Sequence, residues 1–190
     1  PLWISDNRAG EVDIARFEDL CKSENVIGEI GLDFSSKHKH SREKQIAAFE
    51  RELRAIRDSG DGKVVFLHVV HAYDAAFQLL DQFDTFKGNK VVFHWFQGTP
   101  DDFGRALAGG AMFSIGMRMM AKSAGEYFAK NCPSDSLLME TDNPPHPGMP
   151  YSIDLWEEEL KATAKSLAEL RGISEEEVVR IANENSNKLL

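Results

Sequence analysis

Residues 26–32 read Val-Ile-Gly-Glu-Ile-Gly-Leu, and this short apolar run decides the fold because it opens a series of similar runs. Its length and its β-branched residues favour a strand over a helix. Each run is followed by a longer, amphipathic or polar stretch. Such alternation predicts a parallel sheet with helical crossovers, either a barrel or an open doubly wound sheet. The other runs lie at residues 64–68, 91–96, 112–115 and 137–140.

Helix signals stand between these runs. Apolar residues recur at helical spacing over 46–56, amid Arg, Glu and Lys, and the pattern returns over 74–83. Thr99 and Pro100 predict an N-cap followed by proline at the first helical position, in a helix that stops at residues 109–110. Near the end of the chain, we expect a long helix after Pro150 that ends at Gly172, and a capping box of Ser174 and Glu177 that starts another.

The composition is that of one folded domain. The chain has 190 residues, of which 42% are hydrophobic and 28% charged, which excludes a disordered or collagen-like protein. We expect a single domain over residues 1–190, since no linker or repeat interrupts the series. Acidic residues outnumber basic ones by 31 to 22, a net charge of −9. This balance argues against a broad phosphate-binding face, but a local basic patch beside a metal remains compatible with it.

Two cysteines, Cys21 and Cys132, are too few for a disulfide framework and are typical of a reducing compartment. No apolar run approaches the ~18 residues of a membrane span. These features predict a cytoplasmic protein with no membrane partner. Cys132 precedes Pro133 near a predicted helix end, where a structural cysteine is expected rather than a nucleophile. Pro1 stands where a start methionine is expected, which indicates a processed, cut or incomplete N-terminus.

Ionisable residues occupy corresponding places in the predicted strands. Glu29 lies inside the first run, His68 and His94 close two others, and residues 140–142 close the last. In parallel α/β folds the carboxyl ends of the strands form the active face, so these residues converge. A single histidine at a strand end is usually a hydrogen-bonded core residue, but the whole set favours a metal. Burying the Glu29 carboxylate is costly unless a cation compensates it, and Zn, Mn, Fe or Mg fits such ligands.

Other common chemistries lack their motifs. The glycines around residue 28 do not form the GxGxxG pattern of a dinucleotide-binding turn, and the GxxxxGK[ST] phosphate loop is absent from the sequence. The sequence also has no GxSxG nucleophile elbow. Metal chemistry is therefore the leading hypothesis.

Several motifs resemble the TatD family of metal-dependent hydrolases. They are GEIGLDF at 28–34, LH ending at His68, HWFQG at 94–98 and METDNPP at 139–145, with a similar closing segment over 167–190. The resemblance implies a distorted TIM-type (β/α) barrel that holds two divalent metal ions, Mg, Mn or Zn. Residues 1–3 look like the end of the family segment after its third strand. The first two or three strands, which carry a His-x-His metal-binding pair, are thus expected upstream of this chain.

The resemblance also implies a role for each matching residue. Glu29 bridges the two metals, His68 and His94 bind one of them, and Asp142 binds the other. Catalysis then uses a water activated by two metals, which Asp142 orients or deprotonates. Glu29 and Asp142 are accordingly the catalytic residues that we expect.

The substrate implied by the resemblance is DNA, with removal of nucleotides from single-stranded 3′ ends. Local basic residues support phosphate binding: Lys39 and Arg42 lie in the loop after the Glu29 strand, and Arg118 follows the 112–115 strand. His71 stands near an arginine of the family and either replaces it or begins the next helix. Two alternatives stay open: a hydrolase of another phosphoester, amide or ester, and a non-catalytic barrel subunit of a larger complex.

Overall fold

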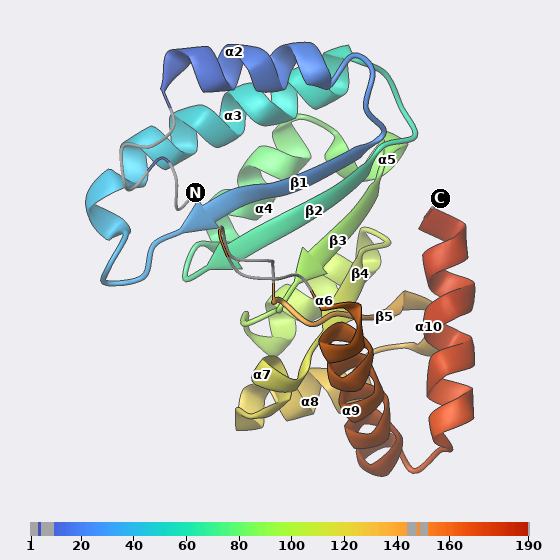
Figure 1. The fold of residues 1–190 in the computed structure, drawn as a ribbon. Coiled ribbons are helices and arrows are strands. Elements are labelled where there is room, and N and C mark those ends of the chain that lie inside the picture. Colours follow the sequence, from blue (N-terminus) through green and yellow to red (C-terminus); the bar gives the residue numbers. More distant parts are fainter. Residues whose placement is uncertain (1–3, 5–9, 144–147, 149–151, 190) are drawn as a thin grey trace. The chain divides into compact units, whose positions relative to one another are not determined.

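The computed structural model describes residues 4, 10–143, 148 and 152–189, which fall into two compact units, Pro1–Ala111 and Met112–Leu190 (Figure 1). The prediction of a single domain stays a prediction. The first unit alternates helices and strands as the apolar runs indicate. Its elements are α2 (Glu11–Leu20), β1 (Val26–Asp33), the short 3-10 helix η1 (Lys39–Ser41), α3 (Arg42–Asp58), β2 (Val64–Val70), α4 (Tyr73–Gln82), α5 (Thr85–Gly88), β3 (Lys90–His94) and α6 (Pro100–Ala108).

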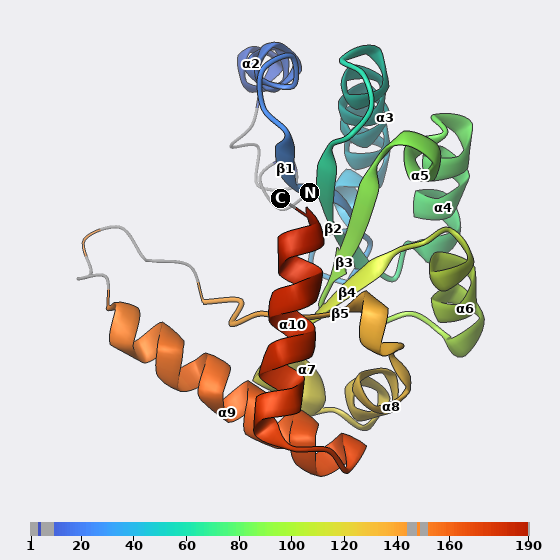
Figure 2. The same cartoon turned by 90° about the vertical axis from the view of Figure 1, so that its right-hand side faces the viewer.

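The strands of the first unit are parallel and follow one another in chain order. β2 pairs with β1 and with β3, and its register places His68 directly beside His94. Helices α3 and α4 lie on one side of these strands (Figure 2). The core between them is apolar and aromatic, since Phe49, Phe77 and Phe93 are each at most 1% exposed. This burial supplies the main stabilising energy of the unit and fixes the positions of the strand ends.

Several predicted boundaries in this unit hold, and others move by a few residues. Thr99 caps α6 as expected, because its hydroxyl accepts a hydrogen bond from the Asp102 N–H and Pro100 begins the helix. The run 91–96 was expected as one strand, but β3 ends at His94. Trp95 has a left-handed backbone with φ of 40° and breaks the strand there. β1 and β2 are longer than expected and reach Asp33 and Val70.

The second unit contains β4 (Met112–Ile115) and β5 (Leu137–Met139), which pair in parallel. The Asn185 side-chain amide on the last helix donates to the carbonyls of Ser134, at 2.6 Å, and Leu137, at 2.8 Å, and so anchors that helix to the start of β5. The other elements are α7 (Met117–Met120), α8 (Ser123–Asn131), the 3-10 helix η2 (Ser134–Ser136), α9 (Ile153–Arg171) and α10 (Glu175–Leu189).

The two closing helices follow the predicted signals with one correction. α9 ends before Gly172, whose φ of 67° is a left-handed helix cap. The Ser174 hydroxyl accepts from the Glu177 N–H at 3.2 Å, but the Glu177 carboxylate pairs with Arg180. The expected capping box is thus only half formed, because a guanidinium is a stronger partner for that carboxylate than a backbone N–H.

Cys132 is buried, and burial raises the pKa of its thiol to about 12, which fits the structural role expected of it.

In the ranges 10–143 and 152–189, none of the helices combines the length and the apolar character that crossing a membrane requires. The expected likeness of residues 1–3 to a family segment concerns a part of the chain outside the described residues.

Candidate metal centre

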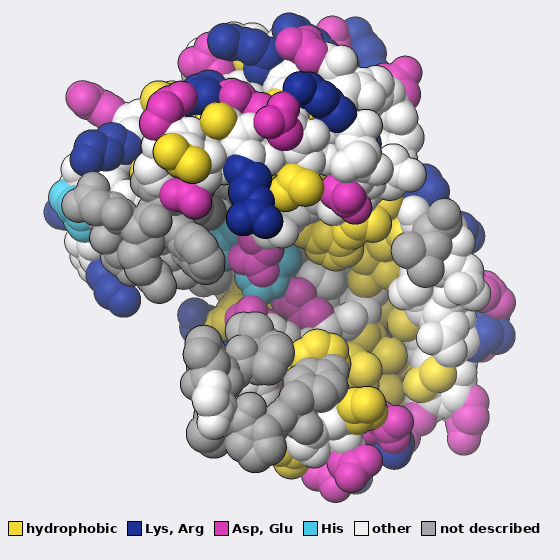
Figure 3. Space-filling view, turned by 45° about the horizontal axis from the view of Figure 1, so that its top comes forward, with side chains coloured by type: hydrophobic (Ala, Val, Ile, Leu, Met, Phe, Trp, Pro, Cys, Tyr) yellow, Lys and Arg dark blue, Asp and Glu magenta, His cyan; other side chains and the backbone are white. Residues whose placement is uncertain are grey.

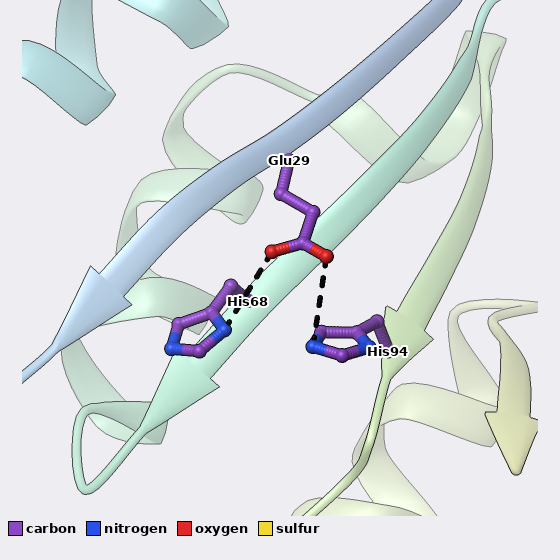
Figure 4. Close-up of side chains that lie close together, drawn as sticks. All are labelled: Glu29, His68 and His94. Carbon is purple, nitrogen blue, oxygen red and sulfur yellow. Dashed lines mark ion pairs between the residues drawn. The ribbon is translucent and has the colours of Figure 1, made fainter. Parts of the chain in front are cut away.

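Three side chains of neighbouring strands meet: Glu29 from the middle of β1, His68 near the end of β2 and His94 at the end of β3 (Figure 4). Glu29 turns one carboxylate oxygen toward each imidazole. Its Oε2 lies 3.8 Å from His68 Nδ1, and its Oε1 lies 3.6 Å from His94 Nε2. One potential ligand atom from each residue lies within 4.8 Å of the other two. The convergence expected of these three residues is therefore present in the structure.

The spacing of these atoms suits a shared cation better than direct hydrogen bonds. Separations of 3.6 and 3.8 Å exceed hydrogen-bond length. Two ligands that each lie ~2.0–2.2 Å from one tetrahedral ion are roughly 3.3–3.6 Å apart, which is close to what the cluster shows. Of the two His68 ring nitrogens, Nδ1 faces Glu29, whereas Nε2 is buried near Asp33 without a hydrogen-bond partner. Carboxylate and imidazole are ordinary ligands of divalent metals, so the residues present fit such an ion.

Gly31 allows β1 to approach the backbone of His68 closely. The register pairs these two residues, and a Cβ at position 31 would collide with the His68 carbonyl oxygen. The φ of Gly31 is +137°, a conformation that side-chain-bearing residues rarely adopt. Both the close contact with His68 and the backbone conformation therefore require glycine at position 31.

Asp33, which sequence reasoning did not single out, lies on the other side of His68. Its Oδ2 is 3.6 Å from His68 Nε2, and its side chain is only 8% exposed. The Ser35 N–H donates to Asp33 Oδ1 at 2.8 Å. Metal-binding histidines commonly direct their second ring nitrogen at a carboxylate, so Asp33 is placed to orient His68. Its position at the end of a buried run, like that of His68 and His94, is the signal that could have revealed it.

The Gln45 side chain fixes the strand end that carries Asp33. Its Oε1 accepts from the Asp33 N–H at 2.7 Å, and its Nε2 donates to the Asp33 carbonyl at 2.8 Å. Gln45 is fully buried on α3, so these bonds lie away from solvent. The amide takes the place of a neighbouring strand for this residue and holds β1 against α3.

Burial and neighbouring groups together shift the pKa values of His68 and Asp33. Desolvation lowers the pKa of His68, and the nearby His94 adds to this against the opposing effect of Glu29. For Asp33, burial alone would raise the pKa. The hydrogen bonds from Ser35 and the neighbouring His68 outweigh burial, so the Asp33 pKa lies below its usual value. The result is a neutral imidazole beside an ionised carboxylate, the forms that a metal site requires.

Three predicted substrate-binding residues lie in the first unit. Lys39 lies in η1 and Arg42 begins α3, and both are exposed. His71 follows β2 with a left-handed φ of 52°, and α4 begins only at Tyr73, so His71 is not part of that helix. Within the same basic loop His38 is buried, and its carbonyl accepts bonds from Ser41 and Gln45, which indicates a structural role.

The other two predicted site residues, Asp142 and Arg118, belong to the second unit. Asp142 has a left-handed φ of 50°, and its carbonyl accepts a hydrogen bond from Arg118 Nη1 at 3.2 Å. This bond gives Arg118 a structural partner within its own unit. The role of Asp142 as a metal ligand stays a prediction.

The charged surface of the first unit is mixed. Figure 3 shows Lys and Arg side chains interspersed with Asp and Glu over the α2 and α3 side. Arg51 of α3 pairs there with two carboxylates of α2, Glu11 at 2.5 Å and Glu18 at 2.8 Å.

Parallel strands followed by helices, with imidazole and carboxylate side chains gathered toward the carboxyl ends of the strands, define a class of α/β proteins with a candidate metal centre. Within this class, the chain belongs to the family described as TatD related DNase, which matches residues 4–190. The predicted family membership is thus confirmed.

Two relatives illustrate the match. The chain is 29% identical over 166 residues to deoxyribonuclease TATDN3 of Homo sapiens, an alignment that covers 86% of this chain and 59% of that protein. It is 27% identical over 188 residues to the uncharacterized metal-dependent hydrolase YabD of Bacillus subtilis, covering 94% and 71%. The chain therefore spans little more than half the length of the human relative.

A solved structure confirms the predicted class of fold. The YJJV TatD homologue of Escherichia coli superposes with a TM-score of 0.76 at 21% sequence identity, covering 97% of this chain and 72% of the other. The strands of the two units are those of a TIM-type barrel, of which the described residues form an open part. The barrel alternative of the sequence analysis is thus correct, and the doubly wound sheet is not.

Proposed function

We propose that this chain carries the metal centre of a divalent-metal-dependent deoxyribonuclease that removes nucleotides from the 3′ ends of single-stranded DNA. The observation that carries the proposal is the convergence of Glu29, His68 and His94. Two relatives support it by name, the human deoxyribonuclease and the bacterial metal-dependent hydrolase. The family match over nearly the whole chain supports the same reaction class.

Each residue of the candidate metal centre has its own role in this proposal. Glu29, His68 and His94 hold the first divalent cation, and Asp33 orients His68 from behind. A cation held there supplies Lewis acidity and lowers the pKa of water, which suits attack on a phosphoryl group. On the family resemblance, we assign Asp142 to a second cation and to accepting the proton of the attacking water. Mg, Mn and Zn all remain candidates for these cations.

Hydrolysis of labelled DNA tests the proposal. The full chain is stripped with a chelator, supplied in turn with Mg²⁺, Mn²⁺ or Zn²⁺, and given single-stranded DNA labelled at its 5′ end. We expect a ladder that shortens from the 3′ end only when metal is present. Glu29→Gln should lower kcat by at least roughly a hundredfold, because removing a charged ligand weakens both metal binding and charge stabilisation.

The matched control is Glu158→Gln, which makes the same change at an exposed position of α9 and should leave the rate unchanged. A bare phosphodiester, bis(4-nitrophenyl) phosphate, serves as a second substrate. Hydrolysis of that compound without any cleavage of DNA would favour another phosphoesterase. Full activity of Glu29→Gln on DNA would contradict the assigned metal centre.

A further inference from the structure

A pocket of about 340 Å³ opens where the first three strands end. Phe34 follows β1, His71 follows β2 and Gln97 comes three residues after the end of β3. Glu29, His68 and His94 lie on these same strands, so the pocket and the metal centre share one edge of the first unit. Its volume is at the lower end of the range of small-molecule sites, enough for one nucleotide-sized group.

A cation–π pair of Arg42 and Phe34 forms one part of the pocket lining. The Arg42 guanidinium carbon lies 4.5 Å from the centre of the Phe34 ring, and both residues line the pocket. Phe34 is half-buried and Arg42 is exposed. A guanidinium over a ring can also stack on a further planar group and donate from its N–H groups to phosphate.

Another part of the pocket lining is polar and is held in place by a hydrogen bond. The Gln97 N–H donates to the Tyr73 hydroxyl oxygen at 2.7 Å, and Tyr73 packs against the Phe96 ring with centroids 4.9 Å apart. The Tyr73 hydroxyl thus braces the loop after β3. The side chains of Gln97 and Asp74 also line the pocket and are exposed. Amide and carboxylate groups are those that recognise the edge of a base.

The charges of the pocket favour one nucleotide over a long strand. Its lining includes Arg42 but also the carboxylates of Asp74 and Asp102, and Asp102 is already engaged by the N–H and hydroxyl of Thr99. A groove that follows a polyanion is basic along its length, whereas this pocket offers one cation beside neutral and acidic groups.

We propose that this pocket, lined by Phe34, Arg42, His71, Asp74 and Gln97, is a nucleotide subsite. Arg42, held on Phe34, stacks beneath one base, and Gln97 and Asp74 face the edge of that base. The Arg42 N–H edge and the His71 ring donate to the adjoining phosphate. The inference rests on the proposed function and deepens it, because it makes the enzyme selective for nucleic acid over other phosphodiesters.

Arg42→Ala tests the subsite, with Arg54→Ala as the matched control. Arg54 is an exposed arginine on the same helix whose guanidinium also lies over a phenylalanine, Phe83, at 5.9 Å. Kinetics are measured with a short single-stranded oligonucleotide and with bis(4-nitrophenyl) phosphate, which has no base. We expect Arg42→Ala to raise KM for the oligonucleotide by roughly tenfold or more, the effect of one lost stacking contact, and to leave the small substrate within twofold.

Arg42→Lys separates charge from stacking, because it keeps the positive charge but has no planar guanidinium. Its KM for the oligonucleotide should therefore lie only slightly below that of Arg42→Ala. Equal losses on both substrates, or no loss on either, would overturn the subsite.

If the wild type cleaves neither substrate, the proposed function fails, and the subsite is then tested by a binding measurement alone. The fluorescence anisotropy of a labelled dinucleotide should then report binding that Arg42→Ala abolishes and Arg54→Ala preserves. Equal binding of the dinucleotide by the wild type, Arg42→Ala and Arg54→Ala would contradict the proposed subsite.

Discussion

At the scale of single residues, the candidate metal centre depends on side chains that are easy to find and on others that are not. Histidines at the ends of apolar runs are conspicuous in the sequence, and so is a glutamate inside one. Asp33 lies 3.6 Å from His68, and Gln45 holds Asp33 by hydrogen bonds; no spacing rule in the sequence reports either relation. Gly31 is conspicuous only once the register places it opposite His68. The convergence of Glu29, His68 and His94 could thus be predicted, and the groups that lie around them could not.

Gly31→Ala tests how closely the strands must approach. We expect it to lower the free energy of unfolding by about 2–4 kcal/mol, because the new methyl meets the His68 carbonyl and the backbone is strained. It should also weaken metal binding, since His68 is displaced. Gly60→Ala is the control: its φ of +96° is strained too, but nothing lies within 4 Å of the new Cβ.

Chemical denaturation and metal titration of both variants separate the two effects. Gly60→Ala should cost about 1 kcal/mol of stability from backbone strain alone and leave metal affinity unchanged. Equal metal affinities in the two variants would show that Gly31 does not position His68.

At the scale of elements, the strands were easier to predict than their ends. Apolar runs locate a strand because burial on both faces demands them, but the ends depend on local backbone conformation, as at Trp95. α6 was predictable because its start carries a cap and a proline. α2 was not predicted, since its few apolar residues give no clear stripe and ion pairs with α3 contribute to its docking.

Arg51→Met tests those ion pairs through pH. Hydrogen bonding to Arg51 lowers the pKa of Glu18, so the ionised pair stabilises the folded state above the ordinary pKa of 4.5. This stability is lost as pH falls through the lower pKa of the folded state. We expect Arg51→Met to cost about 0.5 kcal/mol at pH 7, as exposed pairs do, and nearly nothing at pH 2.

Urea unfolding at the two pH values measures the difference, and hydrogen exchange should show faster opening of α2 in the variant at pH 7. The control is Arg54→Met, whose partner Glu50 lies on the same helix and therefore leaves α2 unaffected. A loss of the same size at both pH values would indicate that Arg51 acts by packing and not by charge.

At the scale of the whole molecule, the order of strands and helices was sufficient to predict the class of fold, and the motifs were needed to choose the barrel. The first unit brings Glu29, His68 and His94 together over 66 residues of sequence, 29 to 94, because parallel strands end at one edge. Asp142 follows the last strand by the same logic, and its role stays a prediction. Of the proposed nucleotide subsite, the sequence predicted only Arg42 and His71 as substrate-binding residues. The rest of its lining comes from the connections after three strands and from the starts of α3, α4 and α6, whose conformations the apolar pattern does not determine.

The metal content of the protein tests the central claim most directly. The full chain is stripped with a chelator, equilibrated with Mn²⁺ or Zn²⁺, freed of unbound ions and measured by mass spectrometry of the elements. We predict that the wild type and Glu158→Gln retain metal, and that Glu29→Gln and His94→Ala lose at least one equivalent. The retained metal should also raise the melting temperature, as any ligand of the folded state does. A wild type that retains no metal, or a Glu29→Gln that retains as much as the wild type, would contradict the account.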